Sequence, residues 1–189
     1  AVCNTLAWMN TKPESDIDLF IISASRRIWT ARLFAVLPFK ILGLRPKQGA
    51  TNPICFSFFA TEHHLDLRSV RLNKEDVYLA AWIQSLVPVI DRGVTRELHQ
   101  INAWVKAFFP NSFPVAPARP RRLKARPLPL MFFESFARRL QRSRLPNDIQ
   151  SLANLDTRVV VNDEMLKFHP NDRRQEFLSN DVFLVKREA

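Results

Sequence analysis

The sequence predicts an α+β (α/β-like) fold in which helices flank a mixed β-sheet and a helical region follows. Two apolar runs, residues 17–23 and 54–60, have the length and the β-branched or aromatic content of buried strands. Between them, residues 26–44 repeat apolar side chains at helical spacing. A short apolar stretch at residues 1–5 precedes these elements, so the predicted order is ββαβ.

The first two strands are expected to form a hairpin. Residues 10–15 between them are polar and include Pro13, which is typical of a turn. The helix that follows is expected to kink at Pro38, and the breaker-rich residues 49–53 lead into the strand at 54–60. This part of the chain, residues 1–70, is the predicted core.

Beyond the core, the sequence predicts helices and a linker. Asn73 is expected to cap a helix with a buried face from Val77 to Ile90, and a second helix starts at Val94 and stops before Pro110. The expected regions are a helical hairpin at 71–110, a Pro/Arg-rich linker at 111–129, and a C-terminal helix and tail at 130–189 that contains a helix at 130–142 and a short strand at 158–161.

Composition narrows the function classes. The chain has 189 residues, of which 47% are hydrophobic and 24% charged, as in globular proteins. Three glycines are too few for a Walker loop or a Rossmann fingerprint. The net charge of +10 favours a polyanionic partner, which leaves nucleoside triphosphate, RNA, DNA and an acidic protein open.

The cysteines and the apolar stretches bear on where in the cell the protein is located. Cys3 and Cys55 sit in apolar runs, which indicates buried thiols and a cytoplasmic protein. The chain begins without Met directly in an apolar strand, so we expect that residues preceding Ala1 are missing. Arg32 and Lys40 interrupt the most apolar helical stretch, and we therefore expect no membrane span.

The candidate chemistry centres on Asp16 and Asp18. On a strand, residues i and i+2 point to the same face, so these carboxylates should project side by side while Ile17 and Leu19 enter the core. Two adjacent carboxylates need a cation, and hard oxygen ligands suit Mg²⁺ or Mn²⁺. Such an ion can bridge substrate phosphates to the protein.

The segment Ser15-Asp16-Ile17-Asp18-Leu19-Phe20-Ile21-Ile22 resembles the nucleotidyltransferase superfamily that includes DNA polymerase beta, whose hallmark is Gly-Ser, a spacer and Asp-x-Asp. Later segments, at 102–111 and 168–172, resemble an uncharacterised branch of predicted nucleotidyltransferases. The resemblance implies a nucleotidyltransferase-type mixed sheet, a metal-bound nucleoside triphosphate, and transfer of a nucleotidyl group to an acceptor hydroxyl.

Two departures from that pattern stand out. Asn4 and Thr5 occupy the place of Gly-Ser, which keeps the hydroxyl but replaces the glycine with a residue that tolerates left-handed backbone. The family's third carboxylate has no counterpart in the strand at 54–60, where Ser57 is central, and Asp66 is the best substitute.

Further phosphate-binding candidates are Ser15, beside the metal pair, and Arg26 and Arg32, near the start of the helix that follows the metal strand. His169 has no partner at metal-ligand spacing. The basic linker is interpreted as a solvated connection, with a nucleic-acid-contacting arm as the alternative.

Three functions follow as hypotheses. The leading one is a metal-dependent nucleotidyltransferase with Asp16, Asp18 and Asp66 as catalytic residues. The second is an inactive relative that binds nucleotide or RNA through its basic surface. The third is a structural or interaction protein in which the acids are incidental.

Overall fold

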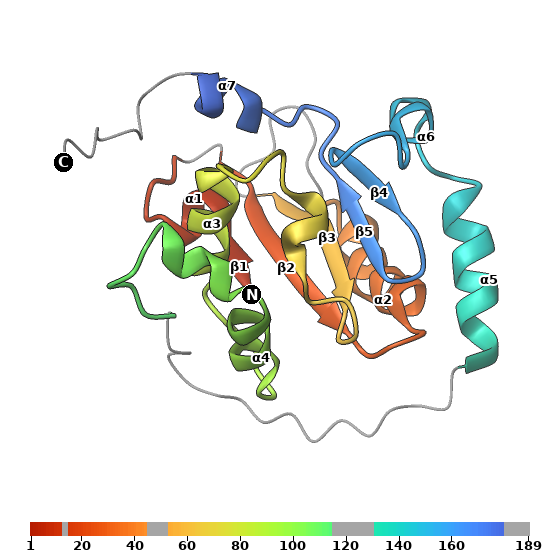
Figure 1. The fold of residues 1–189 in the computed structure, drawn as a ribbon. Helices are drawn as coiled ribbons and strands as arrows, with labels where there is room; N and C mark the ends of the chain where they lie inside the picture. Colours follow the sequence, from red (N-terminus) through yellow and green to blue (C-terminus); the bar gives the residue numbers. More distant parts are fainter. Residues whose placement is uncertain (13–14, 45–52, 115–130, 180–189) are drawn as a thin grey trace.

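The computed structural model describes residues 1–12, 15–44, 53–114 and 131–179. Its centre is a five-stranded mixed sheet in the order β1-β2-β3-β5-β4, flanked by helices (Figure 1). The strands are β1 (Val2–Cys3), β2 (Ile17–Ser23), β3 (Ile54–Thr61), β4 (Val159–Val161) and β5 (Met165–Phe168). The expected α+β class and mixed sheet are confirmed.

Strand directions follow from the connections. β1 and β2 are antiparallel, and β2 and β3 are parallel because helix α2 (Ile28–Ile41) crosses between them. β5 then pairs antiparallel with β3, and β4 antiparallel with β5. The start of β2, the start of β3 and the end of β5 therefore meet at one edge of the sheet.

Helices cover both faces. One face packs against the 3-10 helix η1 (Leu67–Val70), α3 (Val77–Gln84), α4 (Val94–Ile101) and the 3-10 helix η2 (Ala103–Ala107), with Phe20, Phe58 and Trp82 among the buried side chains. The other packs against α2, α5 (Met131–Arg142) and α6 (Asn147–Leu152), around Trp29 and Phe59. Two short helices, α1 (Asn4–Ala7) and α7 (Arg174–Ser179), complete the described fold.

Three local predictions were wrong. Residues after 161 are not all a tail, because β5 joins the sheet between β3 and β4. Asp76, not Asn73, caps α3, since its carboxylate accepts a hydrogen bond from the Leu79 amide at 2.9 Å. The helix that starts at Val94 ends at Ile101, because the side chain of Asn102 turns inward to the carbonyls of Leu65 and Leu98.

The start of α2 is stabilised from far along the chain. The Glu134 carboxylate of α5 accepts hydrogen bonds from the backbone amides of Trp29 and Thr30, both at 2.8 Å. Gln141 of the same helix donates to the Trp29 carbonyl at 2.7 Å. An acidic side chain at a helix N-terminus satisfies unpaired N–H groups and favours the helix dipole, so α5 fixes where α2 begins.

The described helices include none with the length and apolar character that a bilayer span requires.

Candidate functional site

Asp18 lies at the centre of a row that crosses three strands. It is the register partner of Cys3 on β1 and of Cys55 on β3. Paired residues of neighbouring strands project to the same face, and both cysteines are thiols rather than a disulfide. The Asp18 carboxylate accepts a hydrogen bond from the Cys55 thiol. The strand pairing therefore holds the carboxylate from both sides.

The turn after β1 brings Asn4 to the same carboxylate. Asn4 has φ 55°, the left-handed conformation expected of a residue that replaces glycine here. Its side chain hydrogen-bonds to Asp18. Thr5 follows within α1, and the Ser15 hydroxyl accepts a hydrogen bond from the Lys12 amide at 2.9 Å. Residues 4 and 18 thus lie next to each other at this edge of the sheet.

The electrostatics favour a cation near this pair. Burial raises the pKa of Asp18, and the neighbouring charge of Asp16 adds to the rise, while hydrogen bonds from Asn4 and Cys55 oppose it. A cation would offset both unfavourable effects. Within the described residues there is no cluster of three His, Cys, Asp or Glu side chains that could hold a metal. Any metal here would therefore draw on Asp16, Asp18 and ligand oxygens.

A cavity of about 320 Å³ opens beside Asn4, on the sheet face that α3 covers. Its apolar wall is formed by Phe58, Leu79 and Trp82, and the Phe58 and Trp82 rings are stacked with centroids 5.4 Å apart. The remaining lining side chains come from α3 and from the segment around the end of β5: Tyr78, Lys167, His169, Asn171, Asp172, Arg173 and Arg174.

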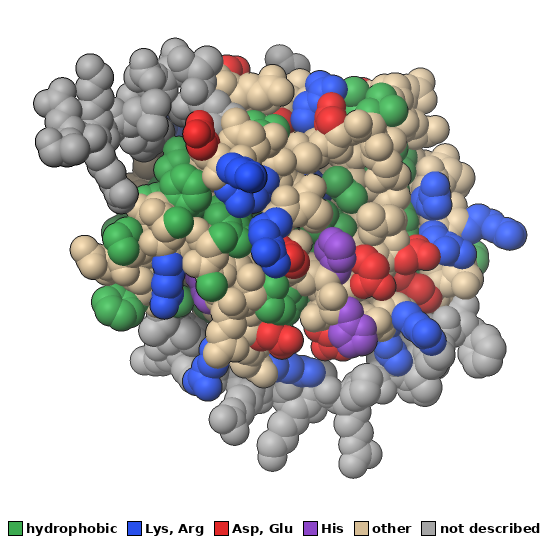
Figure 2. All heavy atoms as spheres, viewed as in Figure 1, with side chains coloured by type: hydrophobic (Ala, Val, Ile, Leu, Met, Phe, Trp, Pro, Cys, Tyr) green, Lys and Arg blue, Asp and Glu red, His purple; other side chains and the backbone are tan. Residues whose placement is uncertain are grey.

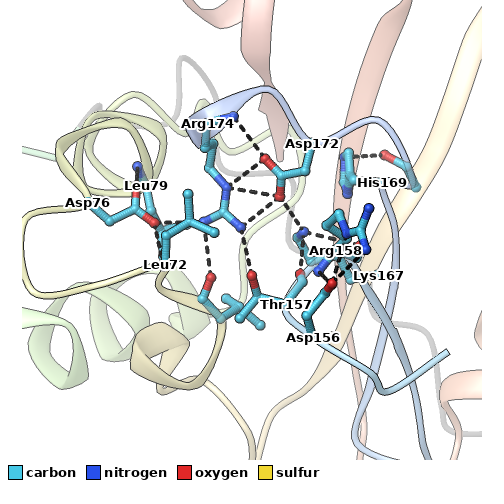
Figure 3. A network of polar contacts seen from close by, with 12 residues as sticks. Leu72, Asp76, Leu79, Asp156, Thr157, Arg158, Lys167, His169, Asp172 and Arg174 are labelled. Carbon is cyan, nitrogen blue, oxygen red and sulfur yellow. Dashed lines mark hydrogen bonds and ion pairs between the residues drawn. The ribbon is translucent and has the colours of Figure 1, made fainter. Parts of the chain in front are cut away.

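An ionic network forms the polar side of this cavity (Figure 3). Arg174 contacts Asp172 and the fully buried Asp76, each at 2.7 Å, and Lys167 contacts Asp172 at 3.1 Å. The Lys167 ammonium also donates to the carbonyls of Thr157 and Arg158. The network joins the segment before α3 to β5 and to the start of α7.

Burial and the charges of the network shift the pKa values of Asp172 and Lys167. Burial opposes ionisation of Asp172, but Arg174 and Lys167 outweigh it and hold the pKa of Asp172 well below its usual range. Burial lowers the pKa of Lys167 to about 8, although Asp172 opposes the change. Asp172 is therefore a carboxylate, and its charge is balanced by its two cationic neighbours.

Ser57, at the centre of β3, contacts His169, which follows β5. The Ser57 hydroxyl and His169 Nε2 are 3.1 Å apart, and the buried Nδ1 of His169 has no hydrogen-bond partner among the described residues. Burial, with a smaller contribution from Lys167, lowers the pKa of His169 to about 3, so the imidazole is neutral at physiological pH.

Two candidates, Asp66 and Arg26, do not reach this edge of the sheet. Asp66 follows β3, whose last residue Thr61 pairs with Ser23 at the far end, and its carboxylate caps η1 and pairs with Arg68 at 2.7 Å. Arg26 follows β2 and lies near Asp163 and Glu164, which flank that same far end. The prediction that these residues join Asp16 and Asp18 is therefore wrong, because a seven-residue strand separates the two ends.

Arg32 lies on the other face of the sheet. Its guanidinium donates to Gln141 of α5 at 2.6 Å and stands 4.8 Å from the centroid of the Phe168 ring. Helix α2 covers the face opposite to Asp18, since residues 18 and 19 of a strand point in opposite directions and Leu19 packs against α2. Its predicted contact with a triphosphate at the Asp16–Asp18 pair is wrong.

Lys167, Asp172 and Arg174 were not among the residues predicted to form the site. Residues 168–172, Phe-His-Pro-Asn-Asp, carried a signal, because they contributed to the resemblance, but nothing local indicated that they line a cavity. Their place depends on the pairing of β5 with β3.

The sequence carries a net charge of +10, and charges of both signs are mixed on the described surface (Figure 2). On the face shown in Figure 2, described Lys and Arg side chains are interspersed with acidic, His and apolar side chains. Most of the Pro/Arg-rich linker at 111–129 lies outside the described residues.

Comparisons with protein-family models, with curated proteins and with solved structures found no match. The chain is an α+β protein with a mixed sheet, two acidic residues at one sheet edge, and a cavity that Asn4 lines next to them.

Proposed function

We propose that this protein is a metal-dependent nucleotidyltransferase of the DNA polymerase beta type. One observation carries the proposal: the Asn4 turn after β1 hydrogen-bonds to Asp18 of the Asp-x-Asp strand. The resemblance places a phosphate-binding turn beside a metal-binding pair, and here residues separated by a long polar spacer meet at one sheet edge.

The carboxylates suit a hard divalent ion. Asp16 and Asp18 would hold Mg²⁺ or Mn²⁺, which would bridge to the triphosphate and offset its charge. The amides of the Asn4–Thr5 turn would orient the phosphate oxygens. The acceptor hydroxyl oxygen bonds to the α-phosphorus as the bond to the bridging oxygen breaks. Pyrophosphate leaves, and the hydroxyl proton passes to solvent.

A second function, nucleotide binding without transfer, is favoured by Ser57. This residue occupies the strand on which a third carboxylate is expected, and it contacts a neutral His169 instead of an ionised group. A neutral hydroxyl is a poor proton acceptor at physiological pH. The two functions share the nucleotide site and differ only in turnover. A cytoplasmic location fits the two thiols beside Asp18.

Thermal unfolding with Mg²⁺ or Mn²⁺ and each of the four nucleoside triphosphates tests the proposal. A ligand that prefers the folded state raises its apparent stability. We expect a metal-dependent rise in Tm that Asp16→Asn/Asp18→Asn removes, whereas Asp66→Asn, which alters an acid at the far end of the sheet, retains it. Pyrophosphate release with candidate acceptors then separates transfer from binding. A folded sample with no shift for any nucleotide would contradict both functions.

A further inference from the structure

The cavity beside Asn4 suits an uncharged part of a ligand better than it suits a phosphate group. Each cation that lines it is already paired with a carboxylate: Lys167 with Asp172, Arg174 with Asp172 and Asp76, and Arg173 with Glu176. A guanidinium or ammonium that already pairs with a carboxylate attracts a further anion more weakly. A phosphate group would gain little from this wall.

The opposite wall offers aromatic and apolar surface. The half-buried Tyr78 of α3 lines the cavity, and behind it the buried Phe58 and Trp82 rings stack on each other. Planar heteroaromatic rings pack well against such surface. A volume of about 320 Å³ is within the range of small-molecule sites.

Besides the paired charges, neutral polar groups line the cavity. His169 is one of them: its Nε2 contacts Ser57, and its Nδ1 has no hydrogen-bond partner within the part of the chain that the structure describes. The exposed Asn171 adds an amide at the rim. Neutral donors and acceptors on an apolar background are suited to the edge of a nucleobase.

The position connects this cavity to the carboxylate pair. Asn4 both lines the cavity and hydrogen-bonds to Asp18. A ligand with phosphates at the Asn4–Thr5 turn therefore has its remaining part directed to the cavity or to solvent. We propose that this cavity binds the nucleoside part of the triphosphate, with the base against Tyr78 and the apolar wall that Phe58 and Trp82 support, and with His169 determining which base is preferred. This inference rests on the proposed function.

Titration calorimetry with Mg²⁺ compares inorganic tripolyphosphate, which has no nucleoside, with each of the four nucleoside triphosphates. We expect at least one nucleotide to bind about tenfold or more tightly than tripolyphosphate. Asn171→Trp should fill the mouth of the cavity and remove this preference without weakening tripolyphosphate binding. Gln175→Trp is the matched control, because residue 175 is exposed nearby but does not line the cavity. His169→Gln should change the ranking of the bases.

The outcomes separate the two proposals. Nucleotide binding that requires Asp16 and Asp18 but survives Asn171→Trp would overturn the nucleoside cavity and keep the proposed function. Nucleotide binding that Asn171→Trp abolishes but Asp16→Asn/Asp18→Asn leaves intact would keep the nucleoside cavity and overturn the proposed function. Equal affinity for tripolyphosphate and all nucleotides would overturn the cavity, and absence of all binding in a folded sample would overturn both.

Discussion

Arg174 Nη1 lies 2.7 Å from the Asp76 carboxylate, although 98 residues separate them in sequence. Asp76 is fully buried, and it also accepts hydrogen bonds from the backbone amides of Leu72 and Leu79. The same guanidinium nitrogen reaches the Val70 carbonyl at 3.0 Å. This single contact therefore joins the start of α3 to the start of α7 and positions one wall of the cavity.

Asp76→Asn should destabilise the fold strongly, because Arg174 would lose a partner in a buried site. Breaking one side of a buried ion pair costs about 3–5 kcal/mol. Urea unfolding followed by Trp fluorescence measures the loss. Asp66→Asn is the matched control, since Asp66 also caps a helix and pairs with an arginine, but its side chain is 42% exposed. A loss as small as that of the control would show that Asp76 and Arg174 do not stabilise the fold as a pair.

Glu134→Gln should destabilise the packing of α2 against α5. The Glu134 carboxylate accepts hydrogen bonds from two backbone amides at the start of α2. A glutamine has only one oxygen to accept these hydrogen bonds, and it carries no charge to interact with the helix dipole. We expect a loss of about 1–2 kcal/mol in the free energy of unfolding. Glu176→Gln, which removes an exposed ion pair with Arg173, should change the stability much less. Equal losses would contradict the role of Glu134.

His169 should make stability fall as the pH is lowered from about 6.5. The pKa of His169 is about 3 in the folded chain and 6.5 ordinarily. Between these pH values the unfolded chain therefore binds a proton at this residue and the folded chain does not. This difference contributes a slope of about 1.4 kcal/mol per pH unit between the two values. Lys167, Asp172 and Arg174 are the charged groups around the ring.

Urea unfolding at pH 6, 5 and 4 checks the His169 prediction. His169→Gln removes the titrating group while keeping a polar side chain, so its stability should vary less with pH than that of the native chain. Asp172, whose folded pKa is lowered, contributes its own loss only as the pH falls below the ordinary Asp value near 3.9. Parallel pH profiles for the two chains would contradict a buried neutral His169.

Asn4→Ala should be less stable than Asn4→Gly. The backbone at Asn4 has φ 55°, which costs an alanine about 1 kcal/mol and a glycine almost nothing. Both substitutions lose the hydrogen bond to Asp18, so their difference reports the backbone alone. Thermal unfolding of the two variants measures it. Equal stability would show that the turn does not require the left-handed conformation.

Much of the core could be predicted because its signals are local. The β-branched run that includes Ile17, Ile21 and Ile22 predicts a strand, and the structure has β2 at Ile17–Ser23, with Asp16 just before it. The helical spacing at 28–41 and the apolar run at 54–61 likewise specify their elements within a few residues. The left-handed tolerance of Asn4 is a property of the residue itself.

Only the tertiary structure decided what surrounds the carboxylate pair. Lys167 and His169 reach the cavity because β5 pairs with β3 over a separation of about a hundred residues, and Arg26, Arg32 and Asp66 are excluded because they lie at the far end or on the other face of the sheet. Spacing along a chain determines the face of a strand or helix, since that geometry is local. Which strands pair, and which helix covers which face, depends on burial of the whole core, and no short segment encodes it.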